Sequence, residues 1–228
     1  FKLKALLNQV YELNKNEYIK IYPPEGYLLT DKADGITMLI YIKNGVCKLL
    51  YGNTAKVFQV TGFNGILLAI GEYINEDNSF DKITGNGDII EETGNIFGIL
   101  LLFDILIYSD NSDSSNLKET NYIHKFDIEK RIKYLDKAAN IITIGINVKC
   151  IPKEFTKLER LTLKETINSV YNKERPYKID GLIFTECNKP YFETMFLKWK
   201  EIPTIDFLCM ECPPILLNKY IYNNIDKH

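Results

Sequence analysis

Lys32-Ala-Asp-Gly35 is the stretch of this chain in which a possible nucleophile stands beside a turn. An apolar run at 27–29 precedes it and a longer one at 36–42 follows it, so we expect two strands joined at Asp34-Gly35. A lysine attacks only as the free amine, and burial or a neighbouring cation favours that form by lowering the amine's pKa. The same four residues also fit a solvated lysine before an ordinary Asp-Gly hairpin turn.

A pair of lysines, Lys198 and Lys200, stands two residues apart near the other end of the chain. Side chains two apart on a strand point to the same face, so the two charges would lie side by side. This arrangement costs energy unless an anion lies between them. We therefore expect a phosphate to bind at this pair.

Two acidic residues stand alone in apolar stretches that have the composition of strands. Glu72 lies in 66–74 and Asp104 lies in 96–108. A carboxylate in such surroundings must be paired, bound to a metal, or placed at an exposed strand end. We expect both residues to have specific partners, because a lone acid is unusual in a pure core.

Composition limits the class of protein. The chain has 228 residues, of which 46% are hydrophobic, enough for one good core with at most a small appendage. Its formal charge of -2 gives no global reason to expect nucleic-acid binding, so any RNA surface would be a local patch. No apolar run has transmembrane length, and we expect no membrane partner. The start at Phe1 is no signal peptide and suggests a piece of a longer protein.

The cysteines and histidines offer little chemistry. An odd number of scattered cysteines, five in all, fits reduced thiols rather than a disulfide framework. Cys209-Met-Glu-Cys212 has the spacing of a metal or redox pair, but no second pair completes a zinc site. The two histidines, His124 and His228, lack a partner motif, which argues against histidine-based catalysis.

Hydrophobic periodicity and turn residues predict an α+β fold. We expect helices at 1–22, 127–143 and about 162–172. We expect a loop that includes a short strand at 75–95, and a second, Ser/Asn/Asp-rich loop at 110–120. The antiparallel meander that we expect uses strands 27–30, 36–43, 46–51, 56–60 and 66–74. Further strands are expected at 96–108, buried on both faces, and at 145–151, 177–184 and 194–200.

Five motifs now stand in order along the chain. They are Lys32-Ala-Asp34-Gly35, Gly71-Glu72, Phe103-Asp104, Asp180-Gly-Leu-Ile-Phe184 and Leu197-Lys-Trp-Lys200. This order resembles that of the covalent nucleotidyltransferases, which comprise DNA ligases, RNA ligases and mRNA-capping guanylyltransferases. The continuation Thr204-Ile-Asp-Phe207 is similar to the capping branch. Closer similarity to the multifunctional capping enzymes of large DNA viruses comes from Tyr22-Pro-Pro, Thr30-Asp-Lys32, Arg175-Pro-Tyr177 and Asp206-Phe-Leu…Cys212-Pro.

The resemblance implies a role for each motif residue. Lys32 would attack the α-phosphate of GTP, and Asp34 and Gly35 would contact the nucleotide. Phe103 and Ile183 would stack on the two faces of guanine. Lys198 and Lys200 would grip the α-phosphate as pyrophosphate leaves. Glu72, near the ribose, and Asp180 would hold Mg²⁺ or Mn²⁺, an ion that prefers a few carboxylates plus substrate oxygens.

The resemblance also implies a fold, an activity and partners. The fold would be α+β, unrelated to ATP-grasp, with antiparallel sheets flanked by helices and the nucleotide in the cleft between sheets. The enzyme would be an mRNA guanylyltransferase that transfers GMP to the 5′-diphosphate end of RNA. Triphosphatase and methyltransferase domains would belong to the same longer polypeptide, in the host cytoplasm (the viral factory) or in the virion.

The domain organisation expected from this resemblance is a nucleotidyltransferase domain at 1–212 and the start of a linker at 213–228. Only 21 residues follow Phe207, too few for the oligonucleotide-binding barrel that covers the nucleotide in capping enzymes. Two positions depart from the family pattern. Thr37 stands where an arginine often contacts the ribose, and Ile70 stands where a second acid is common.

Two alternative functions remain open from the sequence. An RNA or DNA ligase would use the same lysine chemistry with ATP in place of GTP. A catalytically silent scaffold would keep the fold for nucleotide binding alone, with Thr37 and Ile70 as marks of decay. The joint presence of Lys32, Glu72, Asp180, Lys198 and Lys200 argues against decay.

Overall fold

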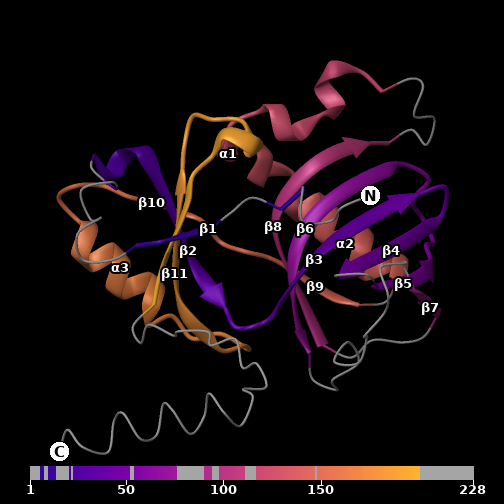
Figure 1. The fold of residues 1–228 in the computed structure, drawn as a ribbon, viewed down its shortest axis with the longest axis horizontal. Coiled ribbons are helices and arrows are strands. Elements are labelled where there is room, and N and C mark those ends of the chain that lie inside the picture. The colour runs from indigo at the N-terminus through magenta and orange to yellow at the C-terminus, as the bar shows by residue number, and fades with distance from the viewer. Residues whose placement is uncertain are drawn as a thin grey trace, which may run out of the picture.

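Two β-sheets face each other across a shared interior (Figure 1). The structure is a computed structural model. It describes residues 6–7, 10–13, 21, 23–51, 54–75, 90–93, 98–110, 117–146 and 148–200. In this described part of the chain no helix is long and apolar enough to cross a membrane.

The smaller sheet has five strands in the order β1-β12-β11-β2-β10. Its strands are β1 (Val10–Glu12), β2 (Tyr27–Ala33), β10 (Thr156–Lys157), β11 (Ile179–Glu186) and β12 (Phe196–Trp199). All neighbours pair antiparallel except β1 and β12, which are parallel. Two short 3₁₀ turns, Pro24–Gly26 and Tyr191–Glu193, lead into β2 and β12. Helix α3 (Leu163–Tyr171) packs on the outer face, where Leu163, Ile167 and Val170 join Leu29, Leu182 and Leu197.

The larger sheet has seven strands in the order β7-β5-β4-β3-β6-β8-β9. Its strands are β3 (Ile36–Lys43), β4 (Val46–Tyr51), β5 (Thr54–Gln59), β6 (Ile66–Asn75), β7 (Ile90–Thr93), β8 (Gly98–Ser109) and β9 (Lys149–Pro152). The two edge strands pair in parallel with their neighbours, β7 with β5 and β9 with β8. The other pairs are antiparallel. The connection from β8 to β9 contains 3₁₀ turns Glu119–Asn121, Ile123–Lys125 and Ile132–Tyr134 and the helices α1 (Ile128–Arg131) and α2 (Leu135–Ile146).

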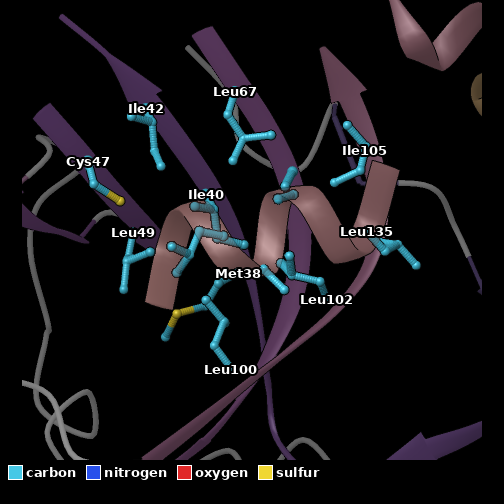
Figure 2. Close-up of a cluster of buried hydrophobic side chains, with 14 of the residues drawn as sticks. Met38, Ile40, Ile42, Cys47, Leu49, Leu67, Leu100, Leu102, Ile105 and Leu135 are labelled. Carbon is cyan, nitrogen blue, oxygen red and sulfur yellow. The ribbon is translucent and has the colours of Figure 1, made fainter. Parts of the chain in front are cut away.

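The largest core lies between the seven-stranded sheet and α2. Figure 2 shows side chains of β3, β4, β6 and β8, such as Ile40, Leu67 and Leu102, gathered at this helix. A second cluster, which includes Leu39, Ile70, Phe103, Ile183 and Phe196, joins residues of both sheets. The sheets are thus held together by apolar contacts on their inner faces, and each outer face is covered by a helix.

The predicted meander is wrong in one respect that matters for function. Its strands exist and are antiparallel where they pair, but β2 lies in the five-stranded sheet and β3 in the seven-stranded one. Asp34-Gly35 is therefore a crossing between sheets rather than a hairpin turn. In addition, β6 pairs with β3 instead of β5. An Asp-Gly pair can turn the chain either within a hairpin or between two sheets. The turn residues alone therefore do not distinguish the two arrangements.

The predicted helix at 1–22 is also wrong over Val10–Glu12, which forms β1. The backbone of this segment pairs with β12, and Leu13 N donates to Lys198 O over 2.8 Å just after it. An open strand edge thus outweighs the helical spacing of the leucines. Most of the remaining N-terminal residues lie outside the described ranges.

Most of the other predicted strands and helices are present in the structure. β8 is the predicted buried strand, with β6 and β9 on its two sides. The predicted helix at 162–172, the strand at 145–151 and the strands at 177–184 and 194–200 are confirmed as α3, β9, β11 and β12 within a few residues. The predicted helix at 127–143 is broken into α1, a 3₁₀ turn and α2. The expected loop at 75–95 contains β7, and most of it, like most of the loop at 110–120, lies outside the described ranges.

The partner of Asp104 is an arginine that the sequence did not reveal. Arg131 Nε donates to Asp104 Oδ1 over 2.8 Å, and Arg131 Nη2 donates to Oδ2 over 3.0 Å. The side chains are 0% and 1% exposed. Arg131 Nη1 also donates to the carbonyl oxygens of Phe126 and Lys189. This one guanidinium therefore ties β8 and α1 to the segment between β11 and β12, and so joins the two sheets.

We expect Arg131→Met to lower the free energy of unfolding by about 3–5 kcal/mol, because Asp104 would remain buried without a counter-charge. The double variant with Asp104→Leu should recover at least half of that loss, since both charges are then removed together. Urea unfolding of the two variants and the native chain measures this. Equal destabilisation of the single and double variants would contradict it.

Candidate nucleotide-binding site

A pocket of about 310 Å³ lies between the inner faces of the two sheets. The five-stranded sheet contributes the side chains on one wall: Val10, Thr30, Lys32, Ile183, Thr185, Phe196 and Lys198. The seven-stranded sheet and the segments around it contribute the other: Gly35, Thr37, Glu72, Phe103, Ile128, Lys153 and Phe155. One wall is therefore rich in lysine and threonine, and the other brings a carboxylate and aromatic rings.

Strand periodicity places the wall of the five-stranded sheet. Thr30 and Lys32 are two apart on β2 and line the pocket, whereas Asp31 between them faces the opposite side of the sheet. Ile183 on β11 stands directly opposite Thr30 on one side and Lys198 of β12 on the other. The five-stranded sheet thus presents a lysine, a hydroxyl and an apolar side chain in adjacent positions.

Two glycines allow the backbone to close around the site. A Cβ at Gly35 would lie 2.7 Å from Tyr73 O and 2.9 Å from Glu72 Cγ, so only glycine lets the crossing pass this near β6. A Cβ at Gly181 would lie 1.9 Å from Trp199 O. The lack of a side chain at Gly181 therefore lets β11 pack closely against β12.

Lys32 is held by a carboxylate that also holds a second lysine. Its Nζ donates to Asp180 Oδ1 over 2.7 Å, and Lys200 Nζ lies 2.9 Å from Asp180 Oδ2. Burial alone would raise the pKa of Asp180, but the hydrogen bonds and charges of Lys32 and Lys200 outweigh it and lower that pKa. Asp180 is therefore an anion that gathers two cations at the edge of the pocket.

Glu72 lies on the other wall, opposite Thr37 of β3. Burial raises the pKa of Glu72, an effect that the charges of Lys153 and Lys32 and a backbone hydrogen bond from Gly35 only partly offset. Lys153 Nζ lies 3.5 Å from Glu72 Oε2. A buried carboxylate with a raised pKa gains from a further cation, which makes Glu72 receptive to a bound metal ion.

Lys153 is a site residue that sequence reasoning missed. It is buried, it follows β9, and its Nζ lies 5.8 Å from the centre of the Phe103 ring. The same Nζ donates to Asp31 O over 3.1 Å and lies 3.3 Å from Asp31 Oδ1. The sequence signal that was available is a lysine inside an apolar and aromatic stretch, Cys150 to Phe155, for which a buried partner is needed.

Behind the pocket, Asp31 anchors a network on the far face of β2. Arg175 Nε donates to Asp31 Oδ2 over 2.7 Å, and the Tyr177 hydroxyl donates to the same oxygen over 2.9 Å. Burial and the charge of Asp31 raise the pKa of Tyr177. The network holds Asp31, the neighbour of Lys32, in place. Because Lys153 also contacts Asp31, the network helps to position Lys153 as well.

Phe103 reaches the pocket through an irregularity in β8. The pairing of β6 with β8 shifts between Ile70/Asp104 and Gly71/Leu102, which leaves Phe103 as the extra residue. Such a bulge redirects a side chain, and bulges are frequent beside functional sites. Phe103 and Ile183 consequently both line the pocket, one from each sheet.

The structure gathers most of the predicted site residues in one place. Lys32, Gly35, Glu72, Phe103, Ile183 and Lys198 all line the pocket. Asp180 and Lys200 are joined to it through Lys32, as described above. Asp34 is exposed and is not among the lining residues, although its backbone N donates to Lys178 O. Lys198 Nζ lies 3.1 Å from Glu12 of β1.

The two departures from the family pattern have different settings. Thr37 lines the pocket, whereas Ile70 is buried in the cluster between the sheets. Cys47, Cys150 and Cys187 are free thiols, as expected. Cys209-Met-Glu-Cys212 and Thr204-Ile-Asp-Phe207 lie outside the described residues.

Comparison with known proteins supplies close parallels in sequence. No family model matches the chain. The chain is 31% identical over 220 residues to the mRNA-capping enzyme of African swine fever virus (isolate Pig/Kenya/KEN-50/1950). It is 25% identical over 243 residues to a probable mRNA-capping enzyme of Acanthamoeba polyphaga mimivirus. The resemblance to viral mRNA-capping enzymes is confirmed.

These matches cover most of this chain but little of the relatives. The aligned region is 94% of this chain and 22% of the swine fever virus protein, and 87% and 20% for the mimivirus protein. The chain thus spans about a fifth of the length of these relatives. The parallel is to one segment of a much longer protein.

A solved structure supports the fold. The ATP-dependent DNA ligase of bacteriophage T7, in complex with ATP, superposes with a TM-score of 0.50 at 11% identity over 84% of this chain and 67% of the ligase. The expected fold class is confirmed: an α+β fold that is shared with this ligase and has mainly antiparallel sheets flanked by helices.

The Asp180 pair predicts a pH dependence of stability. Because the pKa of Asp180 is lower in the folded chain, the unfolded chain binds more protons and stability rises with pH in this window. The contribution is complete above the unfolded pKa of about 4 and is lost as the pH falls through the folded value. Asp180→Asn should therefore destabilise at pH 7 and have a smaller effect at pH 3.

Urea unfolding at both pH values measures the difference between the native chain and the variant. Asp136→Asn, a change of an exposed residue in the first turn of α2, is the matched control. An Asp180→Asn effect as large at pH 3 as at pH 7 would rule out the ion pairs as its source.

Proposed function

We propose that this chain is the guanylyltransferase domain of a viral mRNA-capping enzyme. The observation that carries the proposal is Lys32, which lines a pocket together with Phe103, Ile183 and Lys198 in a chain 31% identical to such an enzyme. The domain spans residues 1–212, and 213–228 begin a linker. The acceptor is the 5′-diphosphate end of an RNA.

The pocket supplies an apolar place for a base and a cationic place for phosphates. Phe103 and Ile183 line it from opposite sheets and fit the two faces of a flat purine. Lys32, Lys198 and Lys200 supply the positive charge that phosphoryl transfer needs. Gly35, at the crossing between the sheets, lines the pocket and would contact the nucleotide, and Asp34 beside it would reach the nucleotide from outside the pocket lining.

In the first step Lys32 Nζ, after loss of a proton, attacks the α-phosphorus of GTP. A P–N bond forms, the P–O bond to the β-phosphate breaks, and pyrophosphate leaves with the bonding electrons. In the second step the terminal phosphate oxygen of the RNA attacks the same phosphorus and the P–N bond breaks. Lys32 regains its proton, and GMP is joined to the RNA as the cap.

Asp180 is suited to hold Lys32 in place before the reaction. In the ligand-free chain it accepts the 2.7 Å hydrogen bond from Lys32 Nζ. A divalent metal ion held by Asp180 would compete for the carboxylate and so release Lys32 Nζ from this hydrogen bond. Metal and nucleotide binding would thus free the nucleophile from its carboxylate partner.

A divalent ion, Mg²⁺ or Mn²⁺, fits the site only together with its substrate. Among the described residues no group of three or more His, Cys, Asp and Glu side chains could hold a metal ion. Magnesium is commonly bound by one or two carboxylates plus substrate phosphates. Glu72 and Asp180 would hold the ion here, where it would neutralise charge on the phosphates.

The relatives' length supports a proposal of further domains, and their viral origin supports a proposal for the cellular setting. The chain corresponds to about a fifth of the capping enzymes that it resembles. We propose that triphosphatase, methyltransferase and oligonucleotide-binding barrel domains belong to the same polypeptide. Capping by a large DNA virus would take place in the host cytoplasm, at the viral factory, or in the virion.

We expect the chain to become covalently labelled by α-labelled GTP with Mg²⁺, seen as an acid-labile band on a denaturing gel. Lys32→Ala should abolish the band, because no other amine takes its position, and Lys133→Ala, at an exposed lysine, should retain it. Labelling by ATP alone would indicate a ligase. No label from either nucleotide, in the full-length polypeptide as well, would indicate a silent nucleotide-binding module.

Removal of the metal should stop the same reaction. Excess EDTA is expected to abolish label formation, and added Mg²⁺ or Mn²⁺ should restore it, since the phosphate charges otherwise stay unscreened. Asp180→Asn and Glu72→Gln should each raise the metal concentration needed for half-maximal labelling. An unchanged metal requirement in both variants would exclude them as the metal-holding residues.

A further inference from the structure

Thr30 is a buried polar residue whose hydroxyl group is not hydrogen bonded within the described part of the chain. It is 3% exposed, and within the described residues its Oγ1 has no hydrogen-bond partner. Buried hydroxyl groups are almost always paired, and an exception calls for an explanation. Because Thr30 lines the pocket, a ligand in the pocket can supply the partner.

The position of Thr30 indicates which part of the ligand it meets. It lies two residues from Lys32 on the same face of β2, a separation of about 6.5–7 Å along the strand. It stands directly opposite Ile183, which lines the same wall and faces Phe103 of the other sheet. Lys32 marks the phosphate end of the pocket, so Thr30 lies toward the end where the base would stack.

We propose that the Thr30 hydroxyl hydrogen bonds to a polar group on the edge of the guanine base and so helps to determine nucleotide affinity. This proposal rests on the proposed nucleotide site. A hydroxyl both donates and accepts, so it can pair with guanine O6 or with the 2-amino group. A polar group that is buried and unpaired in the free protein gains most from such a ligand, and a base that lacks the group leaves it unpaired.

The test is a cycle between one hydroxyl and the groups on the base. Thr30→Val replaces the hydroxyl by a methyl group. Binding of the α,β-methylene triphosphates of guanosine, inosine and purine riboside is measured by calorimetry, because these analogues do not release pyrophosphate. Inosine lacks the 2-amino group, and purine riboside lacks both exocyclic groups.

We expect Thr30→Val to weaken binding of the guanosine analogue roughly 3- to 10-fold, the range of one neutral hydrogen bond. Binding of the purine riboside analogue should weaken less than about 2-fold, since it has no group to lose. A loss shared by inosine places the contact at O6 or at the adjacent N1–H, and a loss confined to guanosine places it at the 2-amino group. Equal losses for all three analogues, or none for any, would overturn the proposal.

Stability provides the second readout. Removal of a buried, unpaired hydroxyl should leave the melting temperature of the ligand-free chain unchanged or raise it. A lower melting temperature combined with equal affinity losses would mean that Thr30 acts through packing alone. Thr37→Val is the control, because it makes the same side-chain change in the same pocket but at an exposed position on the opposite sheet, and it should not discriminate among the bases.

The outcome is separable from that of the proposed reaction. If the native chain forms no covalent adduct with GTP, the proposed activity fails while the binding cycle still tests the Thr30 contact. If the adduct forms but Thr30→Val affects all analogues equally, the activity stands and this inference fails.

Discussion

The site depends on the crossing of the chain from one sheet to the other at Asp34-Gly35. Because β2 and β3 are consecutive yet belong to different sheets, Lys32 is placed at the junction of the two walls. The pairing of β3 with β6 then sets Glu72 opposite Thr37, across the pocket from Lys32. Gly35 keeps the crossing close to β6, since any Cβ there would collide with Tyr73 O.

Charge in this site is arranged before any ligand binds. Asp180 holds Lys32 and Lys200, while Lys153 compensates Asp31 and Glu72. Each ammonium already has a carboxylate partner, so the chain avoids uncompensated charge in a half-buried cleft. In the proposed function, a nucleotide with its phosphates and metal ion would take over these partners, so the charges that the reaction needs are already in place.

The site residues that could be predicted from the sequence are those marked by local patterns and motifs. The apolar runs on either side of Lys32 placed it between two strands, and ordered motifs pointed to Phe103, Ile183 and Lys198; all four residues line the pocket. Lys153 was missed because its partner Asp31 is 122 residues away in the chain.

Three structural features depend on residues far apart in the chain and could not be predicted from the sequence. Arg131, the partner of Asp104, lies 27 residues away on a helix. The crossing of β2 into the second sheet and the strand β1 both follow from which strand edges are open in the folded chain. Local propensity carries no record of such pairings, so neither feature could be derived from it.

The measurement that tests the central claim most directly is peptide mapping by mass spectrometry after incubation with GTP and Mg²⁺. The account predicts a single modified peptide, one that contains Lys32, with a mass increase of one GMP less water on that side chain. An adduct on a different lysine, such as Lys153 or Lys198, would contradict the assignment of the nucleophile. In a parallel incubation with ATP, an AMP adduct formed in preference to the GMP adduct would contradict the assignment of the nucleotide.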